Sequence, residues 1–589
     1  MAENCPDFFT PVFLAMKKKL NVLLLALLAF PAAAIARPVS PLQAQKQAEA
    51  IFSRWHHGPV AVTLTATTTP MAKSRITASA LEQPAFYVYG APQAGGFVIL
   101  SGDDRFPAVV GYSPEGTMTS ADDIPTALQL LLNDYEAYVC DVRAGRADAP
   151  SSIARKAGET TGTPVVGPLV TCAWGQASPF NLLTPLEGRE HTLTGCAATA
   201  MAQILYSWKW PVQGKGYQAY STKYGTLDSD FSSHIYDWES MTDHPSANSS
   251  PEEKAAVSQL CYDCGVAIKM DFGTAGSSAG DDATQLAYYT YFGYRASTLK
   301  IIYRDCMNNQ QEWNACIKAE LDKQRPIEMS GHTSTGAGHA FIFDGYDSNG
   351  YVHVNWGWTG TRDGYYSLSL LNPPGYVFNS SLSAMIGIEP DREGTDTKRP
   401  QIPMRMKSPL RGTWKQRKVT QNFGVVVDTV HNNRSFGRNI AVGVGLYDLD
   451  DNLIDEISKN HGKDTEFYIA WQINYNFGST MCQLEKEYED GYYALRLLFR
   501  EQGFDEWMLP DVEGGSLNNW IPIHIHDGII DFNEAPVGVQ RVETDAAEVS
   551  SITHFDLTGR RIDTPRKGQI YLQRTVLTDG STQWRKILK

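Results

Sequence analysis

The sequence predicts an α+β protein built from several units, and three observations support this. A run of small and apolar residues from Ala197 to Leu205 has the composition of a buried helix. Two later segments, around His339 and Asn355, have the apolar runs and alternation of strands. After residue 403, short strand-like runs recur at regular spacing, which is typical of a β-sandwich. A chain of 589 residues is too long for one core, so we expect three or four units.

Residues 1–36 have the features of an export signal. Lys17–Lys19 is a short basic stretch, Leu20–Phe30 is apolar, and Ala34–Ala36 offers a small-residue cleavage site. The apolar run is shorter than a membrane-spanning helix needs, and we expect no transmembrane segment. The residues before Met16 are unusual for a signal, which leaves open whether Met1 or Met16 is the initiator. We expect a secreted or cell-surface attached protein, exported through the periplasm.

Residues 37–163 predict a separate α+β segment. Pro41–Trp55 has the apolar spacing of an amphipathic helix. A hairpin and one more strand are predicted in Phe86–Tyr89, Gly95–Asp104 and Ala108–Ser113. The stretch Arg143–Thr163 is rich in small, hydroxyl and basic residues, so we expect it to be an exposed linker that is cut on activation.

Cys196 is the predicted nucleophile. It follows Gly195 at the start of the helical run, with Thr194 as the expected N-cap. A cysteine in the first turn lies at the positive end of the helix dipole, which favours the thiolate over the thiol. An isolated cysteine is more often a buried structural residue. The other residues of the predicted site favour the interpretation of Cys196 as a nucleophile.

A thiolate nucleophile needs a base, a group that orients the base, and donors for the oxyanion. His339 is the expected base, because small residues precede it and a strand follows. Asn355 is the expected orienter of the imidazole, and Trp356 would shield their hydrogen bond from water. Gln176 offers an amide that could join the backbone N–H of Cys196 in an oxyanion hole. The distant histidine and asparagine fit a papain-like pattern.

Three other residues compete for these roles. His332 lies in a segment rich in Gly, Ser and Thr and is expected to be an exposed loop residue. His353 shares a strand face with Asn355 and is expected to be structural. Asp344 falls on the face opposite His339 if the strand is regular, so Asn355 is the preferred orienter.

These segments resemble the streptopain-like cysteine proteases, a bacterial family of the papain clan. The matching segments, in order, are Trp174–Asn181, Gly195–Ile204, Gly338–Gly345 and His353–Trp358. Phe180 stands where the family usually has Tyr. The resemblance implies a papain-like protease domain over residues 164–390, with a helical half around Cys196, a β-rich half around His339 and Asn355, and a cleft between them.

The resemblance also assigns roles to residues. It implies Cys196 as nucleophile, His339 as general base and acid, Gln176 as oxyanion donor, Asn355 as orienter and Trp356 as its cover. The loop Met270–Gly280 is also similar to the family, and we expect it to border the cleft. The expected substrate-binding residues are Ser277, Ser278 and Gly338.

Residues 37–163 resemble the family's inhibitory propeptide. The segment keeps the elements Gly95–Val98 and Ser101–Asp104 of that propeptide. The resemblance implies an intramolecular inhibitor of the protease, and an ordinary accessory domain is the alternative.

The C-terminal part of the chain predicts three further regions. Residues 391–402 form a charged linker with Gly and Pro, and residues 403–505 predict an immunoglobulin-like β-sandwich. Residues 506–589 predict a β-rich sorting or anchoring region. Its end, with His554–Ile562, Gly568–Leu572 and a basic terminus, resembles the sorting modules of type IX export. That resemblance implies recognition by an export machinery, and an ordinary terminal hairpin is the alternative.

Composition narrows the functions further. A net charge of −14 argues against nucleic acid as a partner. Cys261 and Cys264 form a C-x-x-C without a second ligand pair, in a predicted core helix, so no metal or organic cofactor is expected. Pairing of Cys306 with Cys316 stays open.

The sequence therefore predicts a secreted cysteine endopeptidase that is made as a zymogen. It would hydrolyse protein or peptide substrates through a Cys–His ion pair and an acyl-enzyme. Two alternatives stay open. One is another Cys–His acyl transferase, such as a transglutaminase or amidase, and the other is a surface adhesin with a protease-like domain.

Overall fold

The computed structural model describes most of the chain from Pro38 to Leu588. The described residues are 38–67, 84–118, 120, 124, 126–147, 149–150, 160–332, 338–367, 382–396, 403–432, 437–458, 466–470, 474–475, 478–533, 549–555, 561–562, 570–577 and 582–588. The predicted export signal and the middle of the predicted activation linker lie outside them. No helix in the described part of the chain combines the length and apolar composition that crossing a membrane requires.

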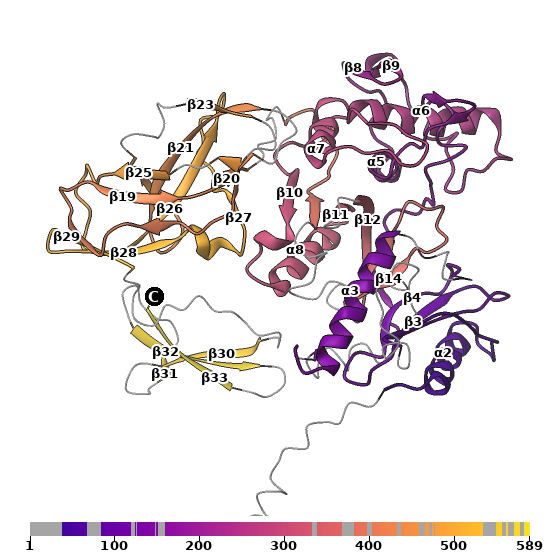
Figure 1. The fold of residues 1–589 in the computed structure, drawn as a ribbon, viewed down its shortest axis with the longest axis horizontal. Helices are drawn as coiled ribbons and strands as arrows, with labels where there is room; N and C mark the ends of the chain where they lie inside the picture. The colour runs from indigo at the N-terminus through magenta and orange to yellow at the C-terminus, as the bar shows by residue number, and fades with distance from the viewer. Residues whose placement is uncertain are drawn as a thin grey trace, which may run out of the picture.

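The N-terminal unit is a small sheet with a helix on each face (Figure 1). The predicted helix Pro41–Trp55 is confirmed as α2, and it begins with a capping box between Ser40 and Gln43. The strands are β1 (Thr63–Ala66), β2 (Phe86–Gly90), β3 (Phe97–Ser101) and β4 (Val109–Ser113). Alternate residues of these strands pack on α2 and on α3 (Thr126–Arg143), so the sheet is buried on both faces.

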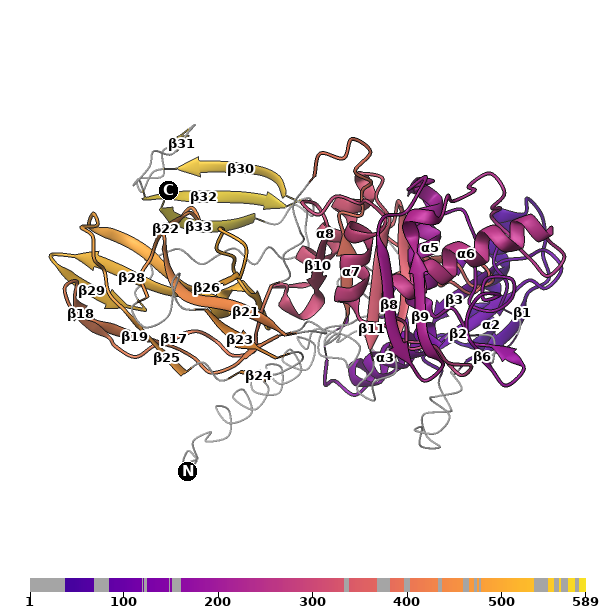
Figure 2. The ribbon, with the colours of Figure 1, turned by 90° about the horizontal axis from the view of Figure 1, so that it is seen from above.

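The helical half of the next unit has α5 (Cys196–Trp208) at its centre. Helices α6 (Pro251–Ala267) and α7 (Asp281–Thr290) complete it, with the hairpin β8 (Tyr217–Thr222) and β9 (Gly225–Asp230) at one side (Figures 1 and 2). Ten consecutive residues of α5, from Ala197 to Tyr206, are buried. A helix that is apolar on all sides needs neighbours on all sides, which explains its central position.

The β-rich half is an antiparallel sheet with the order β14-β13-β12-β11-β15-β10. Its strands are β10 (Lys300–Tyr303), β11 (Ile327–His332), β12 (Gly338–Asp347), β13 (Val352–Asn355), β14 (Gly364–Tyr366) and β15 (Ser383–Ile386), and β5 (Pro164–Val166) pairs with β12. Helix α8 (Gln310–Asp322) packs against this sheet.

The N-terminal sheet and this sheet are continuous. Strand β4 pairs antiparallel with β14, in a register that aligns Tyr112 with Tyr365 and Gly111 with Tyr366. The result is one 11-stranded sheet that joins both units. Apolar residues of α3, including Leu132 and Tyr135, lie in the same core as residues of β11 to β14. The first unit is thus built into the second rather than attached by a linker alone.

The C-terminal sandwich extends beyond its predicted end at residue 505. Strands β28 (Ile521–His526) and β29 (Ile529–Phe532) belong to the same sheet as β26 (Gly491–Glu501) and β21 (Arg438–Tyr447). One core contains residues from Met404 to Phe532, so the predicted boundary is wrong. In the sequence these strands are short apolar runs that could belong to either unit. The pairing of β28 with β26 and of β29 with β28 assigns them to the sandwich. An immunoglobulin-like topology stays a prediction.

The remaining sandwich strands complete two facing layers and an edge sheet (Figure 1). They are β16 (Arg405–Met406), β17 (Arg411–Gly412), β18 (Gln416–Lys418), β19 (Phe423–Val427), β20 (Val430–His431), β22 (Leu453–Glu456), β23 (Glu466–Ile469), β24 (Asn474–Tyr475), β25 (Gly478–Cys482) and β27 (Asp511–Val512).

The predicted linker 391–402 is partly integrated into the protease unit. The N–H of Asp391 donates to the carbonyl of Gly293 at 3.0 Å, and the carboxylate of Asp396 accepts from the N–H of Ser297 at 2.8 Å. Residues 391–396 therefore belong to the preceding unit, because their polar groups find partners there. Residues 397–402 lie outside the described part.

A four-stranded antiparallel sheet ends the chain, with the order β31-β30-β32-β33 (Figure 2). Its strands are β30 (Val549–Phe555), β31 (Arg561–Ile562), β32 (Ile570–Leu577) and β33 (Thr582–Leu588). The predicted strand meander is present in the backbone, and its role in export stays a prediction.

Candidate active site

Cys196 is the first residue of α5, but Thr194 is not its N-cap. The N-cap is Gly195, with a φ of 88°, a region that glycine enters without steric cost. A Cβ on Gly195 would lie 2.7 Å from the Met270 side chain, so the loop before the thiol also needs the missing side chain. The Thr194 hydroxyl is used elsewhere, on the carbonyl of Gln176 at 3.2 Å and on the Thr199 hydroxyl at 3.0 Å.

A pocket of about 110 Å³ opens beside Cys196. Five of the eight predicted site residues line it, namely Cys196, His339, Gly338, Ser277 and Ser278. They come from α5, from the start of β12 and from the loop before α7. The helical half and the β-rich half therefore meet at this pocket, where the family resemblance implies a cleft.

The imidazole of His339 is bonded to a backbone carbonyl. Its Nε2 lies 3.0 Å from the carbonyl oxygen of Trp356. A carbonyl oxygen only accepts, so Nε2 carries a proton and donates it there. Burial lowers the pKa of His339 to about 4, and the bond to Trp356 opposes that shift only in part. The base is neutral at ordinary pH in this conformation.

The thiol of Cys196 is not activated here. Burial raises its pKa above the ordinary value, although backbone N–H groups such as that of Ala340 act in the opposite direction. In the described part of the chain no hydrogen bond joins Cys196 to His339. The expected thiolate–imidazolium pair is therefore not formed in this conformation, because desolvation outweighs the helix dipole when no cation is in contact.

In the described part of the chain the hydrogen bonds of the Asn355 amide go to groups other than His339. Its Nδ2 donates to the carbonyl of Cys172 at 2.8 Å, and its Oδ1 accepts from the N–H of Gly357 at 3.0 Å and from Nε2 of Gln203 at 3.2 Å. A buried amide is stable only with its hydrogen bonds satisfied, and these groups satisfy it. The orienting role stays a prediction for another conformation.

Trp358 lies beside His339, whereas Trp356, the predicted cover of the Asn355–imidazole hydrogen bond, is part of the core. The ring of Trp356 is fully buried against Phe341 and Tyr366, with ring centroids 5.1 and 5.5 Å apart, so it supports the core. Trp358 is 40% exposed and its Nε1 lies 3.3 Å from Nε2 of His339. Sequence reasoning missed Trp358, although its two-residue spacing from Trp356 was an available signal.

Gln176 lies next to the nucleophile loop through its backbone. Its carbonyl accepts from the N–H of Thr194 at 3.0 Å, two residues before Cys196. Gln176 is half-buried but is not among the residues that line the pocket. Its role as an oxyanion donor stays a prediction.

Asp344 and His353 form a pair on the other side of β12. Nδ1 of His353 lies 2.6 Å from Asp344, whose second oxygen accepts from the N–H of Val170 at 3.1 Å. Burial would lower the pKa of His353, but the carboxylate of Asp344 outweighs it and raises that pKa. This agrees with the prediction that neither residue orients His339. His332 ends β11, and its side chain is outside the described part.

The pocket also contains polar residues that the sequence analysis did not single out. Glu328 and Ser330 from β11, Asp281 and Thr284 from α7, and Ser383 from β15 line it. The available signal was the alternation in β11, which places Glu328 opposite the buried Ile327 and Met329.

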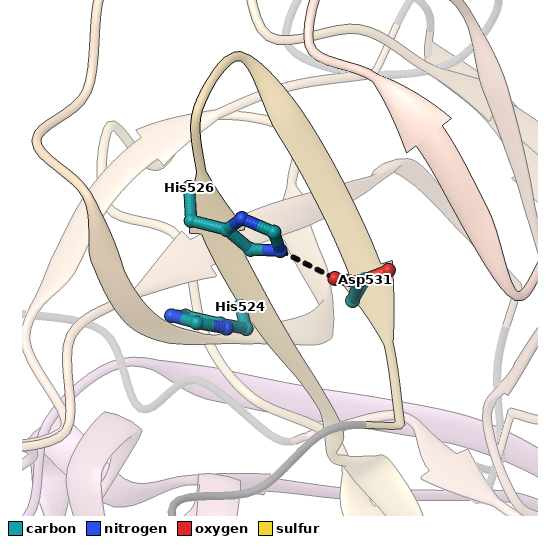
Figure 3. Close-up of side chains that lie close together, drawn as sticks. All are labelled: His524, His526 and Asp531. Atoms are coloured by element: carbon teal, nitrogen blue, oxygen red, sulfur yellow. Dashed lines mark hydrogen bonds and ion pairs between the residues drawn. The ribbon is translucent and has the colours of Figure 1, made fainter.

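The described cysteines and one other cluster bear on metals and disulfides. Cys261 and Cys264 are buried in α6, as expected for core residues, and Cys306 and Cys316 are both free thiols. Among the described residues, His524, His526 and Asp531 lie close enough to hold an ion, and they belong to the sandwich (Figure 3).

Comparison with known proteins gives consistent matches. The sequence model of the peptidase C10 family matches residues 174–366, and that of the Spi protease inhibitor matches residues 36–139. Streptopain of Streptococcus pyogenes is 32% identical over 338 residues, which are 52% of this chain and 80% of streptopain. The match to the Spi protease inhibitor model covers most of the predicted inhibitory segment.

Two further relatives are of different length. The thiol protease/hemagglutinin PrtT of Porphyromonas gingivalis is 32% identical over 402 residues, which are 64% of this chain and 44% of PrtT. The chain thus spans less than half the length of PrtT. A solved fragment of Prevotella intermedia prointerpain A is 30% identical, with 52% of this chain and 96% of that one covered, at a TM-score of 0.44.

Proposed function

This chain belongs to the peptidase C10 family and is a cysteine-type peptidase, and we propose that it is a secreted endopeptidase made as an inactive precursor. The observation that carries the proposal is the pocket shared by Cys196 and His339, in which the base is bonded to a carbonyl while the N-terminal unit is in place. The substrates would be proteins or peptides.

The reaction would use the residues that the sequence analysis named. In the active form His339 takes the proton of Cys196, and the thiolate attacks the carbonyl carbon of the scissile bond. The backbone N–H of Cys196 and the amide of Gln176 would hold the oxyanion. His339 then protonates the leaving amine, and water hydrolyses the thioester. Asn355 would orient the imidazole once it reaches this position.

A continuous set of contacts connects the N-terminal unit to His339 and supports its role as inhibitor. The N–H of Thr117 donates to the carbonyl of Thr361 at 2.7 Å. The hydroxyl of Thr361 donates to the carbonyl of Trp358 at 3.1 Å, and Trp358 lies against His339. Through these bonds the N-terminal unit would hold the loop that fixes the imidazole away from the thiol.

The shared core adds a second restraint. Tyr135 of α3 belongs to the same apolar cluster as Phe341 and Trp356, and Trp356 supplies the carbonyl that binds His339. Each large buried side chain contributes about 1.5–3 kcal/mol through the apolar surface removed from water. Release of the N-terminal unit would expose part of this cluster and allow Trp356 and its neighbours to rearrange.

The end of the predicted linker is attached to the protease unit. The N–H of Gly162 donates to Asp347 at 3.2 Å, and the N–H of Ser348 donates to the carbonyl of Thr163 at 2.8 Å. Tyr112 of the N-terminal unit also donates to Asp347, at 2.7 Å. Residues 162 and 163 would therefore stay with the protease unit after maturation, and the activating cut would fall before Gly162.

Self-processing tests this proposal. Cys196→Ala should accumulate as the full-length precursor and should be cut before Gly162 when active enzyme is added. Residues 37–163, added separately, should inhibit the processed enzyme. N-terminal sequencing and intact mass give the cut site. Normal maturation of Cys196→Ala in a host without other proteases contradicts self-processing. If the separate segment does not inhibit the enzyme, the N-terminal unit is an accessory domain and not an inhibitor.

The alternative chemistries are separated by one further assay. A transglutaminase would incorporate an amine into protein with loss of ammonia, whereas a peptidase releases peptides whose new N-termini can be sequenced. Blocking of peptide release by a thiol-directed peptidyl epoxide separates both from an adhesin. We expect peptide release and no amine incorporation.

Export and sorting are the last part of the proposal. The strand meander after residue 548 and the basic terminus support recognition by an export machinery. Deletion of residues 549–589 should leave the precursor inside the cell envelope, whereas the complete chain reaches the medium or the cell surface. Unchanged localisation of the shortened chain contradicts this role.

A further inference from the structure

We propose that the C-terminal sandwich binds one divalent transition-metal ion, with zinc as the expected ion, through His524, His526 and Asp531. The three side chains converge on one side of the hairpin β28–β29 (Figure 3). Their ligand atoms all lie within 4.8 Å of one another. The site is separate from the pocket at Cys196, since all three residues belong to the sandwich.

Strand geometry explains why the two histidines face the same way. Residues two apart in a strand point to the same side, and Ile523 and Ile525 take the buried side of β28. His524 and His526 therefore share the outer face. The register aligns Asp531 of β29 directly with His524, which brings the carboxylate to both imidazoles.

Neighbouring groups hold the three side chains in place. Asp531 accepts from Nε2 of His526 at 2.6 Å and from the amide of Gln416 at 2.8 Å, one bond on each of its oxygens. Nδ1 of His526 lies 3.5 Å from Asp527, which favours a proton on Nδ1 and leaves Nε2 for a metal. The ring of His524 stacks on Tyr492 at 4.2 Å between centroids.

The chemistry of this set suits zinc. Two imidazole nitrogens and one carboxylate oxygen are ligands that Zn²⁺ takes at about 2.0–2.2 Å, with a fourth position left for water. Ligand atoms around a tetrahedral ion lie about 3.3 Å apart, so small side-chain rotations from the observed positions would complete the set. The ion would replace the proton shared between His526 and Asp531 and join β28 to β29.

Zinc titration of the whole chain tests the proposal. The protein is made without a histidine tag, carries Cys196→Ala to prevent autolysis and thiol binding, and is stripped with EDTA. Isothermal titration with zinc chloride should give one site that the His524→Ala/His526→Ala double variant loses. His431→Ala, a histidine of β20 in the same sandwich, is the matched control and should keep the site.

Thermal unfolding provides the second readout. Zinc should raise the unfolding midpoint of the chain and of His431→Ala, because an ion that binds only the folded state stabilises it, and should not raise that of the double variant. Equal midpoints without metal show that the double variant is folded. Zinc binding with the same stoichiometry in the double variant, or no binding to the Cys196→Ala chain, overturns the proposal.

A different observation carries a second inference, which rests on the proposed peptidase function. We infer that the pocket beside Cys196 receives a basic side chain of the substrate, selected by Glu328 and Asp281. Both carboxyl groups line the pocket, and no Lys or Arg is among the described residues that line it. Ala279, Ile301 and Met385 provide apolar surface for the methylene groups of such a side chain.

The two carboxyl groups are held by neutral partners. The hydroxyl of Tyr288 donates to Glu328 at 3.0 Å, and that of Ser383 donates to Asp281 at 2.6 Å. Burial raises the pKa of Glu328 to about 8. Glu328 is therefore largely protonated near neutral pH while the pocket is empty, and the ammonium or guanidinium group of a substrate would stabilise its carboxylate form.

Matched peptides test this inference with the processed enzyme. Two peptide pairs carry Lys or norleucine at the first or second position on the acyl side of the scissile bond. At one of these positions Lys should be preferred in kcat/KM by about tenfold, and Glu328→Gln should remove most of that preference. Glu190→Gln, at an exposed acid in the same domain, is the control and should retain it.

The same assay separates this inference from the proposed function. Cleavage of the norleucine peptides by the wild-type enzyme establishes peptidase activity independently of the pocket's charge. Equal kcat/KM for Lys and norleucine at both positions, or an unchanged preference in Glu328→Gln, overturns the assignment of the pocket alone.

Discussion

Trp358 lies beside His339, with its indole nitrogen 3.3 Å from Nε2 of the imidazole. Nε2 of His339 donates to the carbonyl of Trp356, so the imidazole is held on the side of the tryptophan loop. Asn355 is bonded to Cys172 and Gln203 instead. This arrangement brings the predicted nucleophile and base to one pocket, while the imidazole is hydrogen-bonded to a backbone carbonyl rather than to the thiol.

Alkylation of Cys196 should depend on pH differently before and after processing. In the precursor, burial raises the thiol pKa, so the thiolate fraction and the iodoacetamide rate should rise only above the ordinary pKa of about 8.5. His339, with a pKa of about 4, is neutral there and gives no ion pair. In the processed enzyme the ion pair should move the rise well below pH 8.5.

Mass spectrometry of the Cys196 peptide measures this rate and excludes the other cysteines. Cys196→Ala serves as the blank for labelling at Cys140 and Cys316. Identical pH profiles for the precursor and the processed enzyme contradict activation by movement of His339.

Asn355 and Asp344 should have separable effects. Asn355→Ala should lower kcat of the processed enzyme by about 10²-fold, because the imidazole loses its orienting partner. Asp344→Ala should destabilise the fold by about 3–5 kcal/mol, since it leaves the buried His353 without its carboxylate. Urea unfolding and kcat are measured on both variants. A folded but inactive Asp344→Ala together with an almost normal Asn355→Ala contradicts the assignment.

Gly111 should control how firmly the N-terminal unit is held. A Cβ at this position would lie 2.6 Å from Cδ1 of Tyr366, which is fully buried across the β4–β14 pairing. Gly111→Val should cost about 1–3 kcal/mol at this junction and accelerate processing of the precursor. Gly58→Ala, where a Cβ meets nothing within 4 Å, is the control. Equal processing rates, followed by gel electrophoresis, contradict a structural role for the junction.

Asp103 should make the N-terminal unit sensitive to acid. Burial alone would raise its pKa, but hydrogen bonds from Arg105 and Arg143 outweigh it and hold the pKa below the ordinary value. The unfolded chain therefore binds the proton more tightly, so this contribution to stability is present above about pH 3.9 and is lost as pH falls through the folded pKa.

Unfolding of Cys196→Ala followed from pH 7 to pH 2 measures this contribution. Adding Asp103→Ala should lower the free energy of unfolding at pH 7 by about 3–5 kcal/mol, because two arginines lose their carboxylate partner. It should also remove this part of the acid transition. A transition of the same size in the Asp103→Ala protein contradicts the role of this cluster.

The export prediction and the C-terminal boundary show two limits of sequence reasoning. Residues 1–36 lie outside the described part, so the export signal stays a prediction. The end of the sandwich was predicted at residue 505, but β28 pairs with β26 and β29 pairs with β18. Short strands have the same local pattern in either unit, and only their distant partners assign them to one.

Local patterns in the sequence by themselves determined the position of Cys196 at the start of a helix, the strand that contains His339, and helix α2. Each depends on neighbouring residues, through helix or strand periodicity. The resemblance to the family, which rests on short motifs, implies that the thiol shares one pocket with Gly338, Ser277 and Ser278, and the structure places all of them there. Their catalytic and binding roles stay predictions.

Tertiary structure alone decided which groups these residues contact. Glu328 reaches the pocket through the pairing of β11 with β12 and β15, and Trp358 reaches His339 through a loop held by Thr117 of the N-terminal unit. Asn355 is bonded elsewhere because Gln203 and Cys172, distant in sequence, satisfy its amide. Hydrogen bonds and packing between distant segments set side-chain orientation, and no local periodicity encodes those partners.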